Sequence, residues 1–146
     1  MVFSSRLLRW IIRLLRVALG GVFVYAAWTK LSQPWELFAM GVDSYQVLPL
    51  KWVELVARTL PWLELAVGAL LIVGRCMRLA GSVTSVLLIV FFTLMVRAYA
   101  KGMEINCGCF GPGEMVSWRT LLRDGSLLAG SLLVTSMAFL RRRESV

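Results

Sequence analysis

The residues best suited to chemistry are two cysteines, Cys107 and Cys109, separated by Gly108. Such a pair can form a disulfide only where the backbone bends enough to bring the two Cα atoms within about 7 Å, and glycine permits that bend. The Gly-Pro-Gly run at 111–113 keeps the following loop out of helix. A ring this tight is strained, and strained exposed disulfides are those that exchange with other thiols. The pattern therefore predicts a thiol–disulfide exchange site.

Three other interpretations of the pair stay open: a permanent disulfide that only stabilises the loop, two unrelated thiols, and a soft-metal site. A disulfide that spans one residue constrains little chain entropy, which disfavours a purely stabilising role. A metal site would need carboxylates such as Glu104 or Glu114, because the sequence contains no histidine. We predict no metal. The third cysteine, Cys76, should lie a membrane thickness away, and we expect it to be a small apolar filler.

Ionisable residues within apolar runs are the next candidates, because charges at such depth are paired or functional. Glu64 lies deepest, just after Pro61, and its expected partner is Arg97 or Lys30. The ion pair is either structural or part of a pocket that binds substrate or quinone. Arg97 would also favour the thiolate form of a nearby cysteine.

The elements that position these residues must be membrane helices. The chain has 146 residues, of which 59% are apolar and 16% charged, and its mean hydropathy is +0.77. Soluble domains carry about 25% charged residues, and a chain this short cannot bury so much apolar surface. A soluble globule, a disordered chain and a disulfide-dense miniprotein are thus excluded. The absence of histidine also excludes catalytic triads and histidine zinc sites.

The charge distribution gives the orientation. The net charge is +8, and the surplus comes from nine arginines that are accompanied by one acid, Glu144. These arginines lie in three places: Arg6, Arg9, Arg13 and Arg16; Arg75 and Arg78; and Arg141, Arg142 and Arg143. The other seven bases are balanced by seven acids. Since the arginines flank apolar runs, the positive-inside rule explains them better than nucleic-acid binding does.

Four runs are long enough to cross the bilayer as helices: 12–31, 53–73, 79–99 and 121–140. We predict an all-α, four-helix transmembrane bundle that forms one domain over residues 1–146, with both termini cytoplasmic. The basic start is expected to lie as an amphipathic helix on the inner leaflet before it turns in. A cleaved signal peptide is a second interpretation of this start, but it would leave an odd number of spans.

Chemistry must then sit at the outer face, which has two loops. In the first loop, Trp35, Phe38, Val42 and Tyr45 share one helical face, which predicts a short interfacial helix that roofs the bundle. An ordinary aromatic belt is the alternative. The second loop carries the two cysteines on the oxidising side of the membrane.

Four features follow in a familiar order: Lys30 with Pro34, Tyr45-Gln46-Val47-Leu48-Pro49, Pro61-Trp62-Leu63-Glu64, and Cys107-Gly108-Cys109-Phe110-Gly111. From about Arg16 to Leu140 the sequence resembles the MauE-like proteins, methylamine-utilisation membrane proteins of the DoxX-like superfamily. The resemblance implies a bacterial inner-membrane bundle, a role in maturation of methylamine dehydrogenase, and a thioredoxin-like periplasmic partner. It marks Cys107 and Cys109 as the redox pair and Lys30, Tyr45, Pro49 and Glu64 as further positions. Relatives are also tied to sulfur-compound oxidation and quinone reduction.

We therefore predict a multi-pass plasma-membrane thiol–disulfide redox protein with its cysteine loop in the periplasm. It would exchange disulfides with an exported thioredoxin-like protein and so support an exported client protein. Electrons would pass to or from quinone in a pocket formed by Lys30, Tyr45, Glu64 and Arg97. Two alternatives are a non-catalytic assembly factor for a periplasmic enzyme and a small-molecule permease, which would need a homo-oligomer.

Overall fold

The computed structural model describes residues 2–110 and 113–143. Within them the chain forms no strand and five helices: α1 (Val2–Leu31), α2 (Trp35–Ser44), α3 (Leu50–Val73), α4 (Met77–Ala100) and α5 (Trp118–Arg143). The predicted all-α class is confirmed. Several residues used in the sequence argument lie outside the described part: Gly111, Pro112, Glu144 and the side chains of Arg142 and Arg143.

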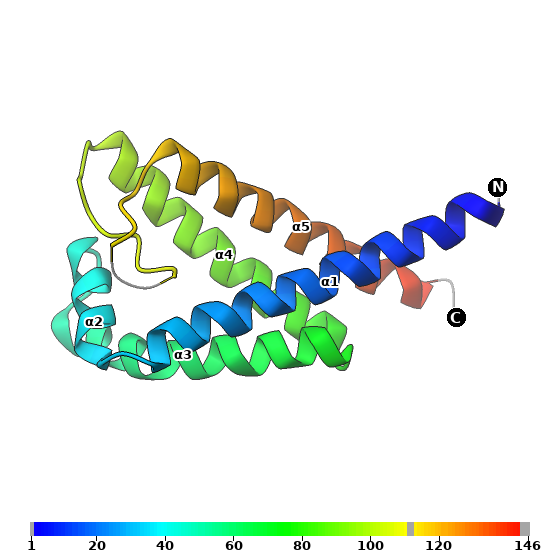
Figure 1. Cartoon of the computed structure of the whole chain (residues 1–146), viewed down its shortest axis with the longest axis horizontal. Helices are drawn as coiled ribbons and strands as arrows, with labels where there is room; N and C mark the ends of the chain where they lie inside the picture. The colour runs from blue at the N-terminus through cyan, green and yellow to red at the C-terminus, as the bar shows by residue number, and fades with distance from the viewer. Residues whose placement is uncertain (1, 111–112, 144–146) are drawn as a thin grey trace.

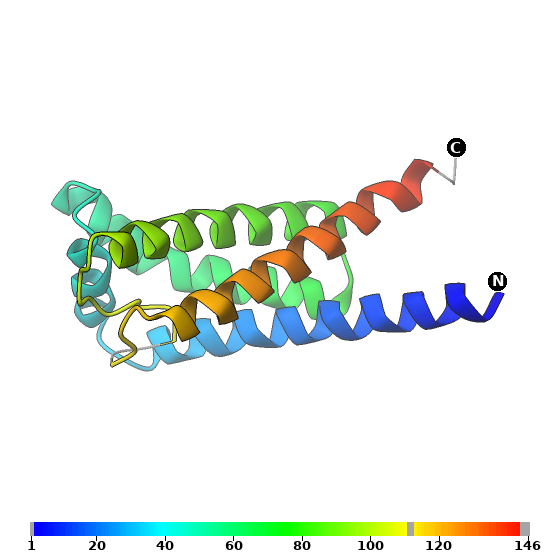
Figure 2. The ribbon, with the colours of Figure 1, turned by 90° about the horizontal axis from the view of Figure 1, so that it is seen from above.

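The four long helices form two packed pairs. Helix α1 packs along α3, and α4 packs along α5, whereas contacts between the pairs are less extensive (Figures 1 and 2). Helix α2 and the loop 101–117 cover one end of the bundle, here called the loop end. The start of α1, the α3–α4 turn and the last turns of α5 point the other way, toward the terminal end.

Small residues allow the helices within each pair to approach closely. A Cβ atom on Gly20 of α1 would stand 2.8 Å from the carbonyl oxygen of Gly68 on α3, and the reverse is equally tight. In the second pair, a Cβ on Gly81 of α4 would stand 2.7 Å from the hydroxyl of Thr135 on α5. Such contacts are typical of helices that pack without a hydrophobic driving force from water.

Two of the described helices, α3 and α4, are long and apolar enough to cross a membrane. They extend the predicted runs 53–73 and 79–99 by only a few residues. Helices α1 and α5 include the other two predicted runs but also carry charged residues among the apolar ones. The expected bend after the basic start is absent, because α1 is continuous over 30 residues.

The predicted short helix is present as α2. Phe38 is buried against α3, where it packs with Ala57 and Leu60, and Trp35 and Val42 pack on the same cluster. Pro34 and Pro49 cap the starts of α2 and α3 and hold extended backbone there. Helix α2 therefore covers the ends of α1 and α3 with the face that the sequence predicted.

The interpretation of Cys76 as an apolar filler is wrong. Cys76 is exposed and precedes α4 in a left-handed conformation with φ of 49°. The short connection explains this: α3 ends at Val73, the Gly74 amide donates to the Leu70 carbonyl, and Cys76 follows in the turn, where it lines an open cavity and not a packed core. The α3–α4 turn, which contains Cys76, lies at the terminal end, opposite the loop that contains the other two cysteines (Figure 1).

Candidate functional site: two thiols, two carboxylates and one arginine

The cysteine loop is a short irregular hairpin at the loop end. Asn106 and Met115 form an isolated antiparallel bridge. Two backbone hydrogen bonds flank it: the Cys107 amide donates to the Glu114 carbonyl at 2.8 Å, and the Val116 amide donates to the Ile105 carbonyl at 3.0 Å. Gly108 has φ of 70°, and its amide donates to the Asn106 side chain. A glycine between the cysteines is therefore required by the backbone, as the sequence indicated.

Both cysteines are thiols in this structure. The Cys109 amide donates to the Cys107 sulfur at 3.5 Å, and the Cys109 thiol donates to the Cys107 carbonyl at 3.7 Å. Cys107 is only 1% exposed and packs against Tyr45, Met95 and Ala98. Cys109 is more accessible and lines a cavity inside the bundle.

Each thiol faces a carboxylate. The Cys107 sulfur lies 3.7 Å from Oε2 of Glu114, and the Cys109 sulfur lies 3.6 Å from Oδ2 of Asp124. Arg123 joins the two acids: its Nη1 donates to both oxygens of Glu114 at 3.0 and 2.9 Å, and its Nε donates to Asp124 at 2.9 Å. The guanidinium also lies 4.4 Å from the centre of the Phe110 ring. One cation therefore orients both carboxylates toward the sulfurs.

The two sulfurs have opposite acidities. When Cys107 is ionised, the Cys109 thiol can donate to its sulfur instead of to the carbonyl, and this hydrogen bond lowers the pKa of Cys107 to about 7 against the opposing effect of burial. The same hydrogen bond, together with burial, raises the pKa of Cys109 well above its ordinary value. Near neutral pH Cys107 is therefore about half ionised, whereas Cys109 stays a thiol.

Tyr45 belongs to this site. It follows the last residue of α2, and its hydroxyl donates to the Cys107 carbonyl at 3.1 Å. Burial raises the pKa of Tyr45, and the neighbouring Cys109, Cys107 and Asp124 raise it further. Tyr45 is therefore a neutral hydrogen-bond donor that fastens the cysteine loop to α2.

Lys30 and Glu64 form a buried ion pair beneath the loop. Nζ of Lys30 lies 3.0 and 2.8 Å from the two carboxylate oxygens of Glu64, and the side chains are 2% and 7% exposed. Nζ also lies 5.2 Å from the centre of the Phe38 ring. Of the two partners predicted for Glu64, the structure thus has Lys30. Arg97 is exposed on α4 and lines none of the cavities described here.

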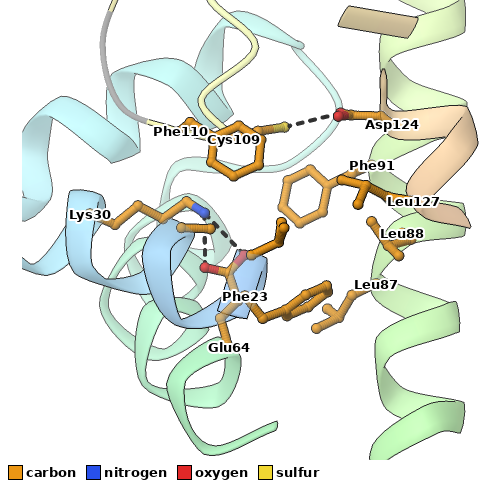
Figure 3. A pocket seen from close by; sticks show the side chains of 12 residues that line it. Phe23, Lys30, Glu64, Leu87, Leu88, Phe91, Cys109, Phe110, Asp124 and Leu127 are labelled. Atoms are coloured by element: carbon orange, nitrogen blue, oxygen red, sulfur yellow. Dashed lines mark hydrogen bonds and ion pairs between the residues drawn. The ribbon is translucent and has the colours of Figure 1, made fainter. Parts of the chain in front are cut away.

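The ion pair and Cys109 line the same cavity, which holds about 40 Å³ between the two helix pairs. Lys30, Glu64, Cys109 and Asp124 form its polar parts, and most of its other walls are apolar side chains (Figure 3). The Cys109–Asp124 contact and the Lys30–Glu64 pair lie on different walls of this cavity. A second cavity, of about 380 Å³, lies between α2 and residues 104–108 and reaches Gly108.

Sequence reasoning missed Asp124 and Arg123, which it counted only as balanced charges, and it considered Glu114 only as a carboxylate that a metal site would need. One signal was available, because Asp124 is the only acid in the run 121–140. Among the described residues, no group of three or more cysteine, aspartate or glutamate side chains could hold a metal ion. The site combines two thiols with two carboxylates and one arginine.

The family model described as "Methylamine utilisation protein MauE" matches residues 8–137 of the chain. This chain belongs to the MauE family. It is similar to the methylamine utilization protein MauE of Paracoccus denitrificans, with 34% identity over 125 residues that cover 84% of this chain and 67% of the relative. The MauE protein of Paracoccus versutus is 32% identical over 134 residues, which cover 90% and 70% of the two chains. No solved structure gives a significant match.

Proposed function

We propose that this MauE-family protein is a membrane thiol–disulfide redox protein in which Cys107 and Cys109 alternate between dithiol and disulfide. The observation that carries the proposal is the pairing of each thiol with a carboxylate, both held by Arg123. Forming a disulfide from two thiols releases two protons, and the site offers one acceptor for each. A cysteine loop that served only as a docking surface would not need a carboxylate beside each thiol.

The proposed topology has α1, α3, α4 and α5 as four spans, with both termini in the cytoplasm. Large apolar side chains are exposed along these helices, among them Leu14, Trp28, Val73 and Leu122. Such surface suits lipid better than water. The α3–α4 turn and the helix ends with the arginine surplus share one end of the bundle, and the cysteine loop occupies the other. The positive-inside rule then favours a periplasmic cysteine loop in a bacterial inner membrane.

In the proposed reaction, a thiolate of a reduced partner attacks the Cys109 sulfur of the disulfide form. Cys109 is the less buried residue of the pair, and Cys107 leaves as the thiolate because its pKa is lower. A second thiolate of the partner then attacks the mixed disulfide and releases Cys109, which takes up a proton through Asp124. The partner leaves oxidised, and the protein is left as the dithiol described above.

The proposed partner is a periplasmic thioredoxin-like protein that hands the disulfide to an exported client. The cavity between α2 and residues 104–108 offers a surface beside Gly108 where such a partner could dock. Since both curated relatives are named for methylamine utilization, we propose that the client belongs to that process.

Reoxidation of the dithiol requires a two-electron acceptor. The cavity at Lys30, Glu64 and Cys109 is apolar enough for the predicted quinone, but about 40 Å³ is small against the 300–1,000 Å³ of ligand pockets. A quinone does not fit in this conformation, and no step is assigned to one. The permease alternative gains no support either, because fully buried Leu71 and Ala80 belong to a packed core between the two ends.

The test is disulfide exchange between purified protein, oxidised beforehand, and a reduced thioredoxin. We expect Asp124→Asn to slow release of the oxidised partner by about 100-fold near neutral pH, since proton transfer to the leaving sulfur is lost. The control Asp43→Asn removes an exposed acid of α2 and should leave the rate unchanged. Equal rates for Asp124→Asn and wild type would refute the assigned role of Asp124.

A second experiment separates exchange from the assembly-factor alternative. The double variant Cys107→Ser/Cys109→Ser should abolish maturation of the client in cells, whereas Cys76→Ser should retain it. Full maturation with the double variant would instead support a non-catalytic platform.

A further inference from the structure

The terminal end of the bundle contains a larger cavity, of about 640 Å³, at the opposite end from the cysteines. Its walls come from α1, the α3–α4 turn, the start of α4 and the last turns of α5. Four arginines line it: Arg13, Arg16, Arg78 and Arg141. No acidic side chain lines it, and none of these arginines forms an ion pair within the described part of the chain.

Arg16, which lines this cavity, has an unsatisfied hydrogen-bond donor. Its Nε is buried and has no hydrogen-bond partner among the described residues. Its guanidinium lies over Gly74, where a Cβ atom would stand 2.8 Å from Nη1. A buried charged nitrogen without an acceptor is costly, so an outside ligand that supplies acceptor oxygens would bind favourably.

The remaining walls of this cavity are largely apolar. They include Ile12, Leu79, Val134, Met137 and Ala138. A ligand that matches the cavity therefore has an anionic head and a hydrocarbon body. The volume lies within the usual range of ligand pockets, and arginine forks match phosphate oxygens bidentately. Basic pockets between membrane helices on the cytoplasmic side suit phospholipid head groups.

We propose that this cavity binds the phosphate group of an anionic phospholipid, with the acyl chains against its apolar walls. In the four-span arrangement proposed above, the cavity lies at the level of the inner-leaflet head groups. Arg16 and Arg78 are only partly exposed and contact the phosphate, while Arg13 and Arg141, which are exposed, lie at the rim. The site is separate from the thiol chemistry, so either proposal can fail alone.

The test is a lipid titration of the purified full-length protein in neutral detergent, followed by native mass spectrometry. We expect one phosphatidylglycerol to bind in preference to phosphatidylcholine. An arginine near a membrane surface contributes about fivefold in affinity, so Arg16→Gln/Arg78→Gln should weaken phosphatidylglycerol binding by about 25-fold. The control Arg75→Gln removes an exposed charge of the same turn that does not line the cavity, and should change binding by less than about twofold.

Three outcomes would overturn the proposal. Equal weakening by Arg75→Gln would mean general surface attraction, and equal binding of the two lipids would mean that no anionic head group is recognised. Displacement of the lipid by inorganic phosphate at comparable concentration would assign the cavity to free phosphate. The variant Arg16→Lys/Arg78→Lys keeps both charges but loses the bidentate geometry, so it should bind phosphatidylglycerol more tightly than the glutamine variant and less tightly than wild type, which distinguishes lost recognition from lost folding.

Discussion

Removing the Cys109 side chain should make Cys107 a much weaker acid. The main cause of the low Cys107 pKa, about 7, is the hydrogen bond that the Cys109 thiol donates to the Cys107 thiolate. In Cys109→Ala this donor is lost while the burial of Cys107 remains, so we expect the pKa to rise toward its ordinary 9.0. At pH 7 the thiolate fraction would fall from about one half to about one hundredth, equivalent to ~2.7 kcal/mol.

The assay is a pH titration of thiolate ultraviolet absorbance in a Cys76→Ser background, which leaves Cys107 as the only titrating thiol of the variant. Subtracting, for each protein, the curve of the same protein with Cys107→Ser added removes the contribution of tyrosines and of any remaining thiol. Cys109→Ser retains a hydroxyl donor and should titrate between wild type and the alanine variant. If Cys109→Ala titrates at the same pH as wild type, the hydrogen bond is not the cause, and the assignment of Cys107 as the leaving thiolate fails.

Three further predictions concern stability, measured by thermal unfolding in detergent. Lys30→Met should destabilise the protein by about 3 to 5 kcal/mol, because it leaves the Glu64 carboxylate buried without its cation. Adding Glu64→Met should restore most of the lost stability. A double variant as unstable as the single variant would contradict this prediction. Gly20→Ala should cost about 1 to 3 kcal/mol through its clash with α3, whereas Gly21→Ala, which meets no atom within 4 Å, should be harmless. Tyr45→Phe should cost about 1 kcal/mol and speed amide hydrogen exchange in the cysteine loop; unchanged exchange would argue against the fastening role.

The helices could be predicted well because their signal is local. The runs 53–73 and 79–99 are nearly continuous in apolar character, and α3 and α4 follow them closely. The face of α2 was equally visible, since its aromatic residues recur at helical spacing. The basic start was harder, because amphipathic spacing alone does not distinguish a separate surface helix from the first turns of a long one.

The site was predictable only in part, because its pairings depend on how distant segments meet. The glycine-separated cysteines are a local pattern and stood out. The choice between Lys30 and Arg97 for Glu64 required knowing how the helices pack, and in the structure α1 packs on α3 more extensively than α4 does, while Arg97 of α4 is exposed. Asp124 was hidden because its role depends on the cysteine loop folding back onto the start of α5.

The weaker contact between the two helix pairs has a mechanical consequence. The cavity beside Cys109 and the arginine-lined cavity both open along the boundary between the α1–α3 pair and the α4–α5 pair. A small rigid rotation of one pair against the other would alter both cavities at once while leaving the glycine contacts within each pair intact. The volume of the cavity beside the Cys109 sulfur therefore depends on the angle between the α1–α3 pair and the α4–α5 pair.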